Sequence, residues 1–193
     1  VLDRCSTPMG GRLLRRWLHR PLRDRAVLGQ RQDSLRRLLE NGGHSYLRGL
    51  LRGVGDVERI LARIALKSAR PRDLTVLADA LARLPEIGEY LRGADAALLQ
   101  QLADQAGTHP DTHASLNRAI VANPPQTLRD GGVIASGYDA ELDRLRDLSE
   151  HADHYLVELE ARERQRTGIA NLKVGFNRVH GYYIEVTRAQ SQA

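Results

Sequence analysis

The chain has 193 residues, and 41% of them are hydrophobic, which indicates a folded protein rather than a disordered one. Aromatic residues make up only 4%, so Leu, Ile, Val and Ala must form most of the core. The single cysteine, Cys5, excludes an internal disulfide and suits a reducing compartment. No apolar run reaches the length of a membrane span and the first residues lack a signal-peptide pattern, so we expect a soluble, cytoplasmic protein with no membrane partner. The formal net charge of +5 favours an acidic partner such as nucleic acid.

Amphipathic helices follow one another through the first two thirds of the chain. Capping residues and prolines mark their ends: Ser6 or Thr7 can cap a first helix that begins at Pro8, and Asp56 can cap a third. We expect helices, in chain order, from Pro8 to Pro21, from about Asp24 to Glu40, from Asp56 to Pro71, from Leu74 to Pro85, and in the stretches AALLQQLADQ and HASLNRAIVAN, before Asn123-Pro124-Pro125 breaks the series.

The longest helix is predicted from Asp139 to about Arg166, after a short β-like run at Val133 to Ala135. Apolar residues recur in it at spacings of three and four, and at about 1.5 Å per residue it would be a rod of roughly 40 Å. Charged residues, including Glu158 and Glu160, crowd its far end, so we expect that end to run through solvent.

A β-element is predicted after Thr167-Gly168, where the long helix should end. Val174 and Phe176 alternate with polar residues, a turn is possible from Asn177 to Gly181, and apolar residues then alternate again at Tyr182, Ile184 and Val186. The predicted fold class is therefore mainly α: a multi-helical core with one long helix, ending in a small β-element.

No constellation of catalytic residues is evident. The sequence has no G-x-x-x-x-G-K-[ST] loop, and GGVIASG, which lacks the lysine, is better explained as a backbone turn. His109 and His113, like His151 and His154, could each supply two ligands to a metal, but zinc needs three or four, and solvated histidines explain both pairs better. Cys5 has no adjacent base and is expected to be a small buried residue. We therefore expect no enzyme and no metal site.

Two groups of basic residues could contact an acidic partner. Arg12, Arg15, Arg16 and Arg20 belong to the first helix, where a solvated or interdomain face is a better explanation than DNA binding. The second group flanks the predicted turn and strands, and it combines the Lys, Arg and amide side chains that bind phosphate oxygens without reading bases. An ordinary polar hairpin edge, protected by Lys and Arg, explains that second group equally well.

Four segments together resemble, in the same order, the middle of the bacterial MutS family of DNA mismatch-recognition proteins. They are TPMGGRLLRRWLHRPLRD, GDVERILARIALKSARPRDL, PPQTLRDGGVIASGYDAELDRLR and RERQRTGIANLKVGFNRVHGYYIEV, and they span nearly the whole chain. The resemblance implies a part of a homodimeric ATPase that closes around mismatched double-stranded DNA and acts with downstream repair proteins such as MutL. The implied location is the bacterial cytoplasm, in association with the nucleoid.

On the map of that family, residues 1–156 would be the first part of the core/lever domain. Residues 157–193 would be the end of the lever helix and the first part of the clamp, which touches the DNA backbone without sequence preference. This role agrees with the second group of polar and basic residues, so the expected DNA-backbone-binding residues are Lys173, Asn177, Arg178, His180, Arg188 and Gln190.

The same family carries features that this sequence does not show. A Phe-x-Glu mismatch wedge and a nucleotide-binding loop are absent, so we expect neither mismatch recognition nor ATP hydrolysis from this chain. No cofactor is expected here, because ATP and Mg belong to the family's separate ATPase domain. Without the second half of a clamp, residues 171–193 are expected to be poorly ordered or paired with another molecule.

Two other functions stay open. The chain could be a purely structural interdomain scaffold with no direct DNA contact. A metal-dependent hydrolase that uses the histidine pairs is a weaker third interpretation.

Overall fold

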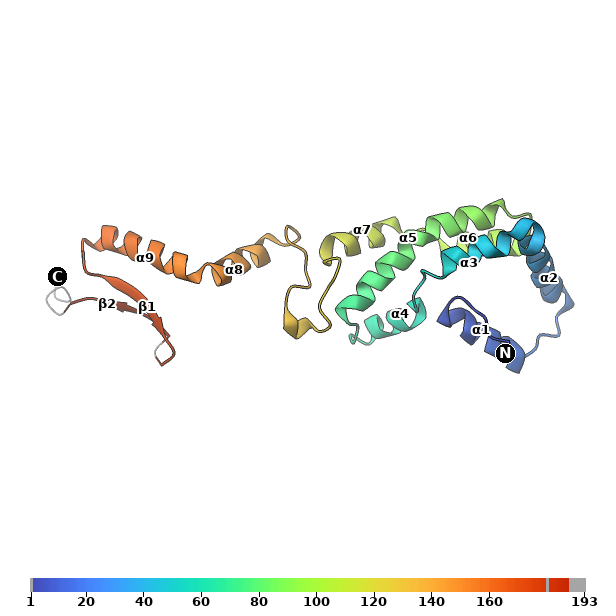
Figure 1. The fold of residues 1–193 in the computed structure, drawn as a ribbon, viewed down its shortest axis with the longest axis horizontal. Coiled ribbons are helices and arrows are strands. Elements are labelled where there is room, and N and C mark those ends of the chain that lie inside the picture. Colours follow the sequence, from blue (N-terminus) through green and yellow to red (C-terminus); the bar gives the residue numbers. More distant parts are fainter. Residues whose placement is uncertain (1, 180, 188–193) are drawn as a thin grey trace. The chain divides into compact units, whose positions relative to one another are not determined.

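The computed structural model describes residues 2–179 and 181–187 (Figure 1). They form two compact units, Val1–Ala135 and Ser136–Ala193, which we call the helical unit and the hairpin unit. The helices of the helical unit are α1 (Pro8–His19), α2 (Arg25–Leu39), α3 (Gly43–Leu51), α4 (Val57–Ala65), α5 (Pro71–Gly93), α6 (Ala97–Ala106) and α7 (Pro110–Ala119), with 3₁₀ turns at Glu40–Gly42 and Leu128–Asp130. The elements of the hairpin unit are α8 (Ala140–Glu150), α9 (Ala152–Thr167), β1 (Lys173–Asn177) and β2 (Gly181–Glu185). The predicted mainly helical fold class is confirmed.

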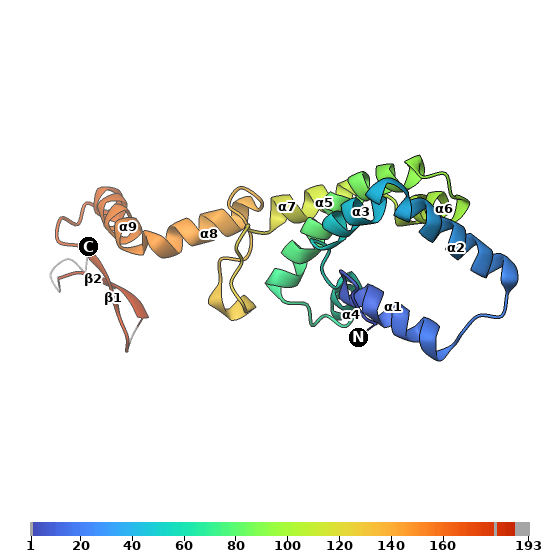
Figure 2. The same ribbon diagram turned by 45° about the vertical axis from the view of Figure 1, so that its right-hand side comes forward.

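Helix α5 is the centre of the helical unit. It packs against α3, α4, α6 and α7, and it runs alongside α6 in each view of the fold (Figures 1 and 2). Ile87 and Leu91 of α5 meet Leu99 and Ala103 of α6 in the buried core, and leucines of α2 and α3 cover them. Burial of these aliphatic side chains supplies the main driving force for the fold, in agreement with the scarcity of aromatic residues.

Two prolines act differently from the sequence prediction. Pro71 was expected to stop the third helix, but α4 ends at Ala65 and Pro71 is the first residue of α5. A proline suits that position because the first helical N–H needs no partner within the helix. Pro85 was expected to end its helix, yet α5 continues through it to Gly93. The burial of Ile87 and Leu91 beyond the proline compensates for the backbone hydrogen bond that Pro85 cannot make.

Arginine–aspartate pairs tie helices of this unit together, α1 to the start of α4 and α4 to α5. Arg12 of α1 donates to both carboxylate oxygens of Asp56 at 2.8 and 2.6 Å, and its Nε donates to Glu58 at 2.9 Å. Arg63 of α4 likewise donates to both carboxylate oxygens of Asp73 of α5, from Nε at 2.7 Å and from Nη2 at 2.6 Å. Arg12 holds the pKa of Asp56 below its usual value, and Arg63 does the same for Asp73.

The β-like run predicted at Val133 to Ala135 forms an isolated bridge rather than a strand. Ile134 pairs antiparallel with Ile120, just after α7, with a backbone hydrogen bond on each side of the pair. The bridge fastens the glycine-rich connection of GGVIASG to the end of α7, which agrees with its interpretation as a backbone turn.

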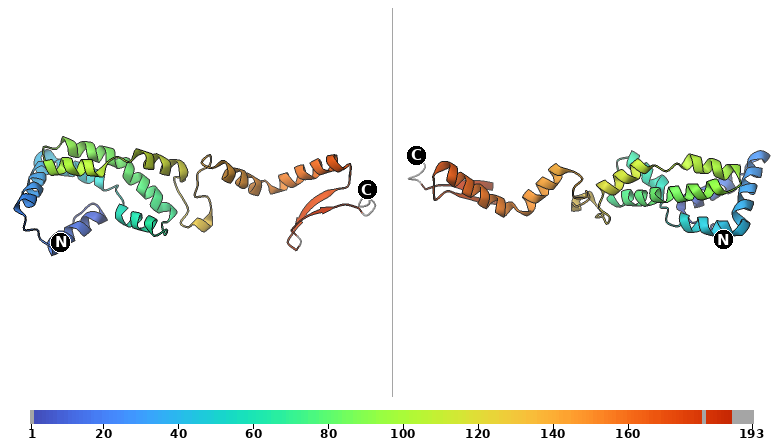
Figure 3. Two further views of the ribbon diagram at one scale, coloured as in Figure 1. Left: turned by 180° about the vertical axis from the view of Figure 1, so that it is seen from behind. Right: turned by 90° about the horizontal axis from the view of Figure 1, so that it is seen from above.

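The prediction of one long helix from Asp139 to Arg166 is wrong, because the segment forms two helices, α8 and α9, with a break at His151 (Figure 3). At His151, φ is −113° and ψ is 28°, outside the helical region, and the ring nitrogen Nδ1 lies 3.2 Å from the backbone oxygen of Asp147. The same nitrogen lies 3.0 Å from the Asp147 carboxylate. The end of α9 follows the prediction: Gly168 has φ +71°, a conformation that favours glycine at the end of a helix.

The predicted hairpin is confirmed. Strands β1 and β2 are antiparallel, with Lys173 opposite Glu185 and Asn177 opposite Gly181. The strands pair with each other and β1 packs on α9 (Figures 1 and 3). The expectation that residues 171–193 are poorly ordered or paired with another molecule stays a prediction. None of the helices in the described residues is long and apolar enough to cross a membrane.

Candidate nucleic-acid interface

The hairpin presents two chemically different faces, because side chains alternate along a strand. We call the first the polar face; it consists of Lys173, Gly175 and Asn177 with their cross-strand partners Glu185, Tyr183 and Gly181. We call the second the apolar face; it consists of Val174, Phe176, Tyr182 and Ile184.

Two cations of the hairpin are available to a partner. Lys173 begins β1 and Arg178 stands in the turn, and both are exposed. Neither side chain makes a hydrogen bond or an ion pair with any residue that the structure describes. Asn177 is engaged locally, since its Oδ1 accepts the N–H of Val179 at 3.0 Å and shapes the turn. The structure thus brings Lys173, Asn177 and Arg178 together in one hairpin.

The other three predicted phosphate-binding residues, His180, Arg188 and Gln190, lie outside the described residues. In the sequence, His180 falls between β1 and β2, and Arg188 and Gln190 follow β2. Their binding role stays a prediction.

A tyrosine covers the middle of the polar face. A Cβ atom at Gly175 would lie 2.8 Å from two ring atoms of Tyr183, so only glycine leaves room for this ring. The far end of the Tyr183 ring therefore lies over Gly175, between Lys173 and Asn177 along β1. The need for glycine opposite Tyr183 was not evident from the sequence.

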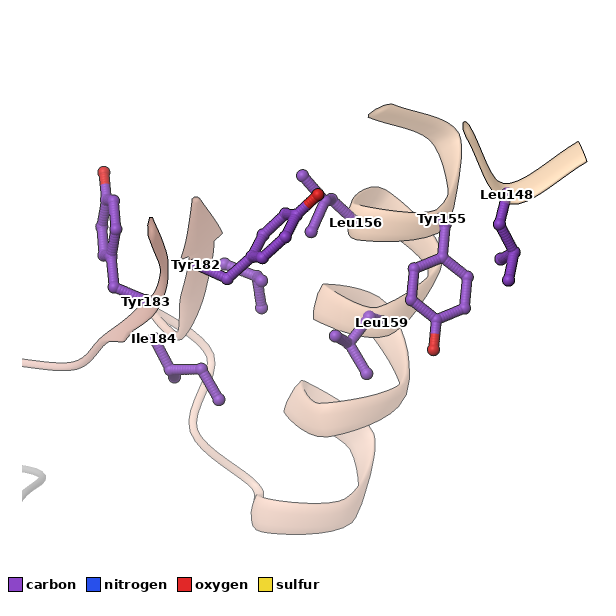
Figure 4. A pocket seen from close by; sticks show the side chains of 8 residues that line it. Leu148, Tyr155, Leu156, Leu159, Tyr182, Tyr183 and Ile184 are labelled. Atoms are coloured by element: carbon purple, nitrogen blue, oxygen red, sulfur yellow. The ribbon is translucent and has the colours of Figure 1, made fainter. Parts of the chain in front are cut away.

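An apolar groove separates the hairpin from the helices of its own unit (Figure 4). The cavity measures about 490 Å³, and Tyr182 points across it toward Leu156. Phe176 and Tyr182 form a tilted ring pair with centroids 4.9 Å apart. The side chains that line the groove are Leu148, Tyr155, Leu156, Leu159, Val174, Tyr182, Tyr183 and Ile184.

Charged residues of α9 hold the base of the hairpin. Glu160 was expected to be a solvated charge, but its Oε2 accepts the backbone N–H of Val174 at 2.9 Å. Arg164 pairs with Glu160 at 2.6 Å and donates from Nε to the backbone oxygen of Leu172 at 2.8 Å. Leu172 is only 4% exposed. We call these two side chains the Glu160–Arg164 pair; Glu158, in contrast, is exposed as expected.

The basic face predicted on α1 is only partly a solvated face. Arg12 forms ion pairs with Asp56 and Glu58, whereas Arg15, Arg16 and Arg20 are exposed. Trp17 of the same helix is covered on one side by the guanidinium of Arg31, 3.7 Å from the ring centroid.

Charge is distributed unevenly along the sequence. Residues 1–37 contain ten arginines and three aspartates, while residues 38–167 contain 16 basic and 20 acidic side chains. Residues 168–193 hold three basic side chains against one acidic. Two segments therefore have a basic surplus, and the acidic helices of the hairpin unit come directly before the second of them.

The histidines and the cysteine have ordinary local partners. His109 contacts the backbone oxygen of Ala106 at 3.0 Å, and His113 contacts Asn117 at 2.9 Å. Among the side chains described, no three or more potential metal ligands come together. Cys5 was expected to be buried but is exposed. The pKa of its thiol is raised, mainly by partial desolvation and secondarily by the nearby Asp3 carboxylate. A raised pKa opposes nucleophilic chemistry at Cys5.

Comparison with protein families gives a match that covers most of the chain. The family model described as MutS domain III matches residues 1–166. The match takes in the whole helical unit and continues through α8 into α9; the hairpin follows the matched residues. The chain therefore belongs to the MutS domain III family, the core and lever region of MutS-type mismatch repair proteins.

Proposed function

We propose that this chain joins the helical core of a mismatch repair protein to a hairpin that contacts the DNA phosphate backbone without reading its sequence. Residues 1–156 would be the first part of the core/lever domain, and residues 157–193 the end of the lever and the first part of the clamp. This division follows the family resemblance, whereas compactness divides the chain after Ala135. An ATPase domain with ATP and Mg, a homodimer and MutL as a partner belong to the proposal for the intact protein.

The observation that carries the proposal is the pair of available cations on the hairpin, Lys173 and Arg178. A cation that already has a carboxylate partner must give it up to bind phosphate, and these two side chains have none among the described residues. Lys and Arg contacts to phosphate add affinity through counterion release and carry no sequence information.

The rival proposal is a scaffold without DNA contact. The arginine–aspartate pairs of the helical unit support it, because Arg12 and Arg63 serve to join helices rather than to face a ligand. The two proposals differ in the hairpin alone: a scaffold needs no cation there.

The test is binding of the chain to homoduplex and G·T-mismatched DNA across a salt series. We expect equal, weak binding to both duplexes that falls steeply with salt. Lys173→Gln and Arg178→Gln should each lower the slope of log affinity against log salt by about 0.9 if each cation neutralises one phosphate.

The matched control is Arg162→Gln, which removes one positive charge from an exposed position of α9. A general effect of net charge would make all three variants alike. Identical slopes for the hairpin variants and the α9 control would contradict the proposed contact and favour the scaffold.

A further inference from the structure

The Glu160–Arg164 pair forms hydrogen bonds with backbone groups along one edge of β1. Backbone groups two residues apart point to the same edge of a strand, and the pair takes one of each kind there: the oxygen of Leu172 and the N–H of Val174. A neighbouring parallel strand would offer the same combination of one donor and one acceptor. The two side chains of α9 therefore occupy the edge of β1 as a short piece of strand would.

These hydrogen bonds hold the backbone of Lys173. Lys173 lies between Leu172 and Val174, so its backbone is held on both sides, and its side chain projects from the opposite face to the buried Leu172 and half-buried Val174. Arg178, in the turn, is five residues further along and has no such support. The geometry distinguishes the two available cations.

We propose that Glu160 and Arg164 are positioning residues that hold Lys173 in the orientation required for phosphate binding. The inference rests on the proposed function and adds to it a specific dependence of Lys173 on α9. Simple electrostatics predicts the opposite effect of Glu160, because a carboxylate near the hairpin should weaken the binding of a polyanion.

The first measurement is hydrogen exchange of the Val174 amide in the full chain. Glu160→Ala removes the acceptor and should speed exchange about fivefold or more, whereas Glu160→Gln makes the same change in charge but keeps an acceptor oxygen, and should speed it less. Glu158→Ala removes an exposed carboxylate of the same helix and should leave Val174 exchange unchanged. Equal exchange in Glu160→Ala and Glu158→Ala would overturn the inference.

The second measurement is DNA affinity at low salt. Glu160→Ala should bind about threefold or more weakly than the unchanged chain, although it removes a negative charge, because Lys173 is no longer held in place. Glu158→Ala should bind equally well or slightly more tightly. Tighter binding by both variants would overturn the positioning role and leave the pair as a purely structural contact.

A double-mutant comparison separates positioning from general damage to the hairpin. In the Glu160→Ala background, Lys173→Gln should have little further effect, whereas Arg178→Gln should keep most of its effect. Equal loss for both cations would mean that the hairpin has unfolded and would overturn a specific role for Lys173. If the unchanged chain binds no DNA at low salt, the proposed function fails and the role of Lys173 fails with it. The exchange of Val174 would then still show whether the pair holds β1.

Discussion

Asp56 has two structural roles at once. Its carboxylate caps α4 by accepting the N–H of Arg59 at 3.4 Å, and it binds the guanidinium of Arg12 from α1. Its side chain is 19% exposed, so the ion pair is partly shielded from water. One carboxylate therefore caps α4 and also ties α1 to the start of that helix.

Replacement of Asp56 should separate these roles. Asp56→Ala removes the cap and the ion pair, and should lower the free energy of unfolding by about 1–2 kcal/mol or more. Asp56→Asn keeps a capping oxygen and removes the charge, so it should destabilise less. Urea denaturation measures both effects, and an equal loss for both variants would assign the whole effect to the ion pair.

The same substitution tests the pH dependence of stability. Because Arg12 lowers the pKa of Asp56 in the folded protein, the ionised form favours folding. This stabilisation is fully present above the ordinary carboxyl pKa of about 4 and is lost as the pH falls through the lowered pKa. Asp56→Asn should therefore lose less stability than the unchanged protein between neutral and acidic pH. Parallel curves of stability against pH would show that other carboxylates, such as Asp73, dominate.

At the level of helices and strands, local signals predicted the elements well. Thr7 and Asp56 each cap the helix that the sequence assigned to them, and Asp24 caps α2 at the predicted start of the second helix. The β-hairpin followed from alternation alone, because its two faces have different chemistry. Residue types and their alternation were therefore sufficient to indicate a basic hairpin, and the family resemblance was needed to favour DNA contact over an ordinary polar edge.

The misread features depend on contacts between distant residues. Pro85 looks like a helix end locally, but burial of Ile87 and Leu91 against α6 carries the helix past it. Glu160 looks solvated because nothing in the sequence places the backbone of Val174 beside it. The break at His151 was invisible because the apolar spacing of three and four continues across it.

Pro85 offers a direct test of this explanation. The residue is exposed and lies inside α5, so Pro85→Ala restores a helical N–H without removing a packed side chain. We expect an increase of about 1 kcal/mol or more in the free energy of unfolding. Pro71→Ala is the matched control at the first position of the same helix, where no N–H is needed and where the proline is buried; it should not stabilise. Stabilisation by both would contradict this explanation, because Pro→Ala gives the unfolded chain more freedom and so cannot stabilise through the denatured state.

For the whole molecule, the important question is which basic segment binds an acidic partner. Residues 1–37 have a larger positive surplus than the hairpin segment, and exposed Arg16 and Arg20 belong to them. Net charge alone would assign binding to that segment. The proposed function assigns it to the smaller surplus at Lys173 and Arg178, because these cations lie on the hairpin that α9 holds in place.

Two double variants with the same change in charge decide between these segments. The double variant Lys173→Gln, Arg178→Gln should lower the slope of log affinity against log salt by about 1.8, as expected for two lost phosphate contacts. Arg16→Gln with Arg20→Gln should change it much less. The opposite result, in the same salt series, would move the DNA contact to α1 and leave the hairpin without that role.

The bonding of α9 to β1 also has a practical consequence for handling the protein. It closes one edge of the hairpin, while the far edge of β2 has no neighbouring strand among the described residues. That edge runs beside Tyr182 and Ile184, which are 66% and 60% exposed, so concentrated samples can aggregate by adding strands to it. Glu185 is the single carboxylate in this stretch and acts as a gatekeeper against such stacking. Removal of that charge, as in Glu185→Gln, should therefore shorten the lifetime of the soluble protein.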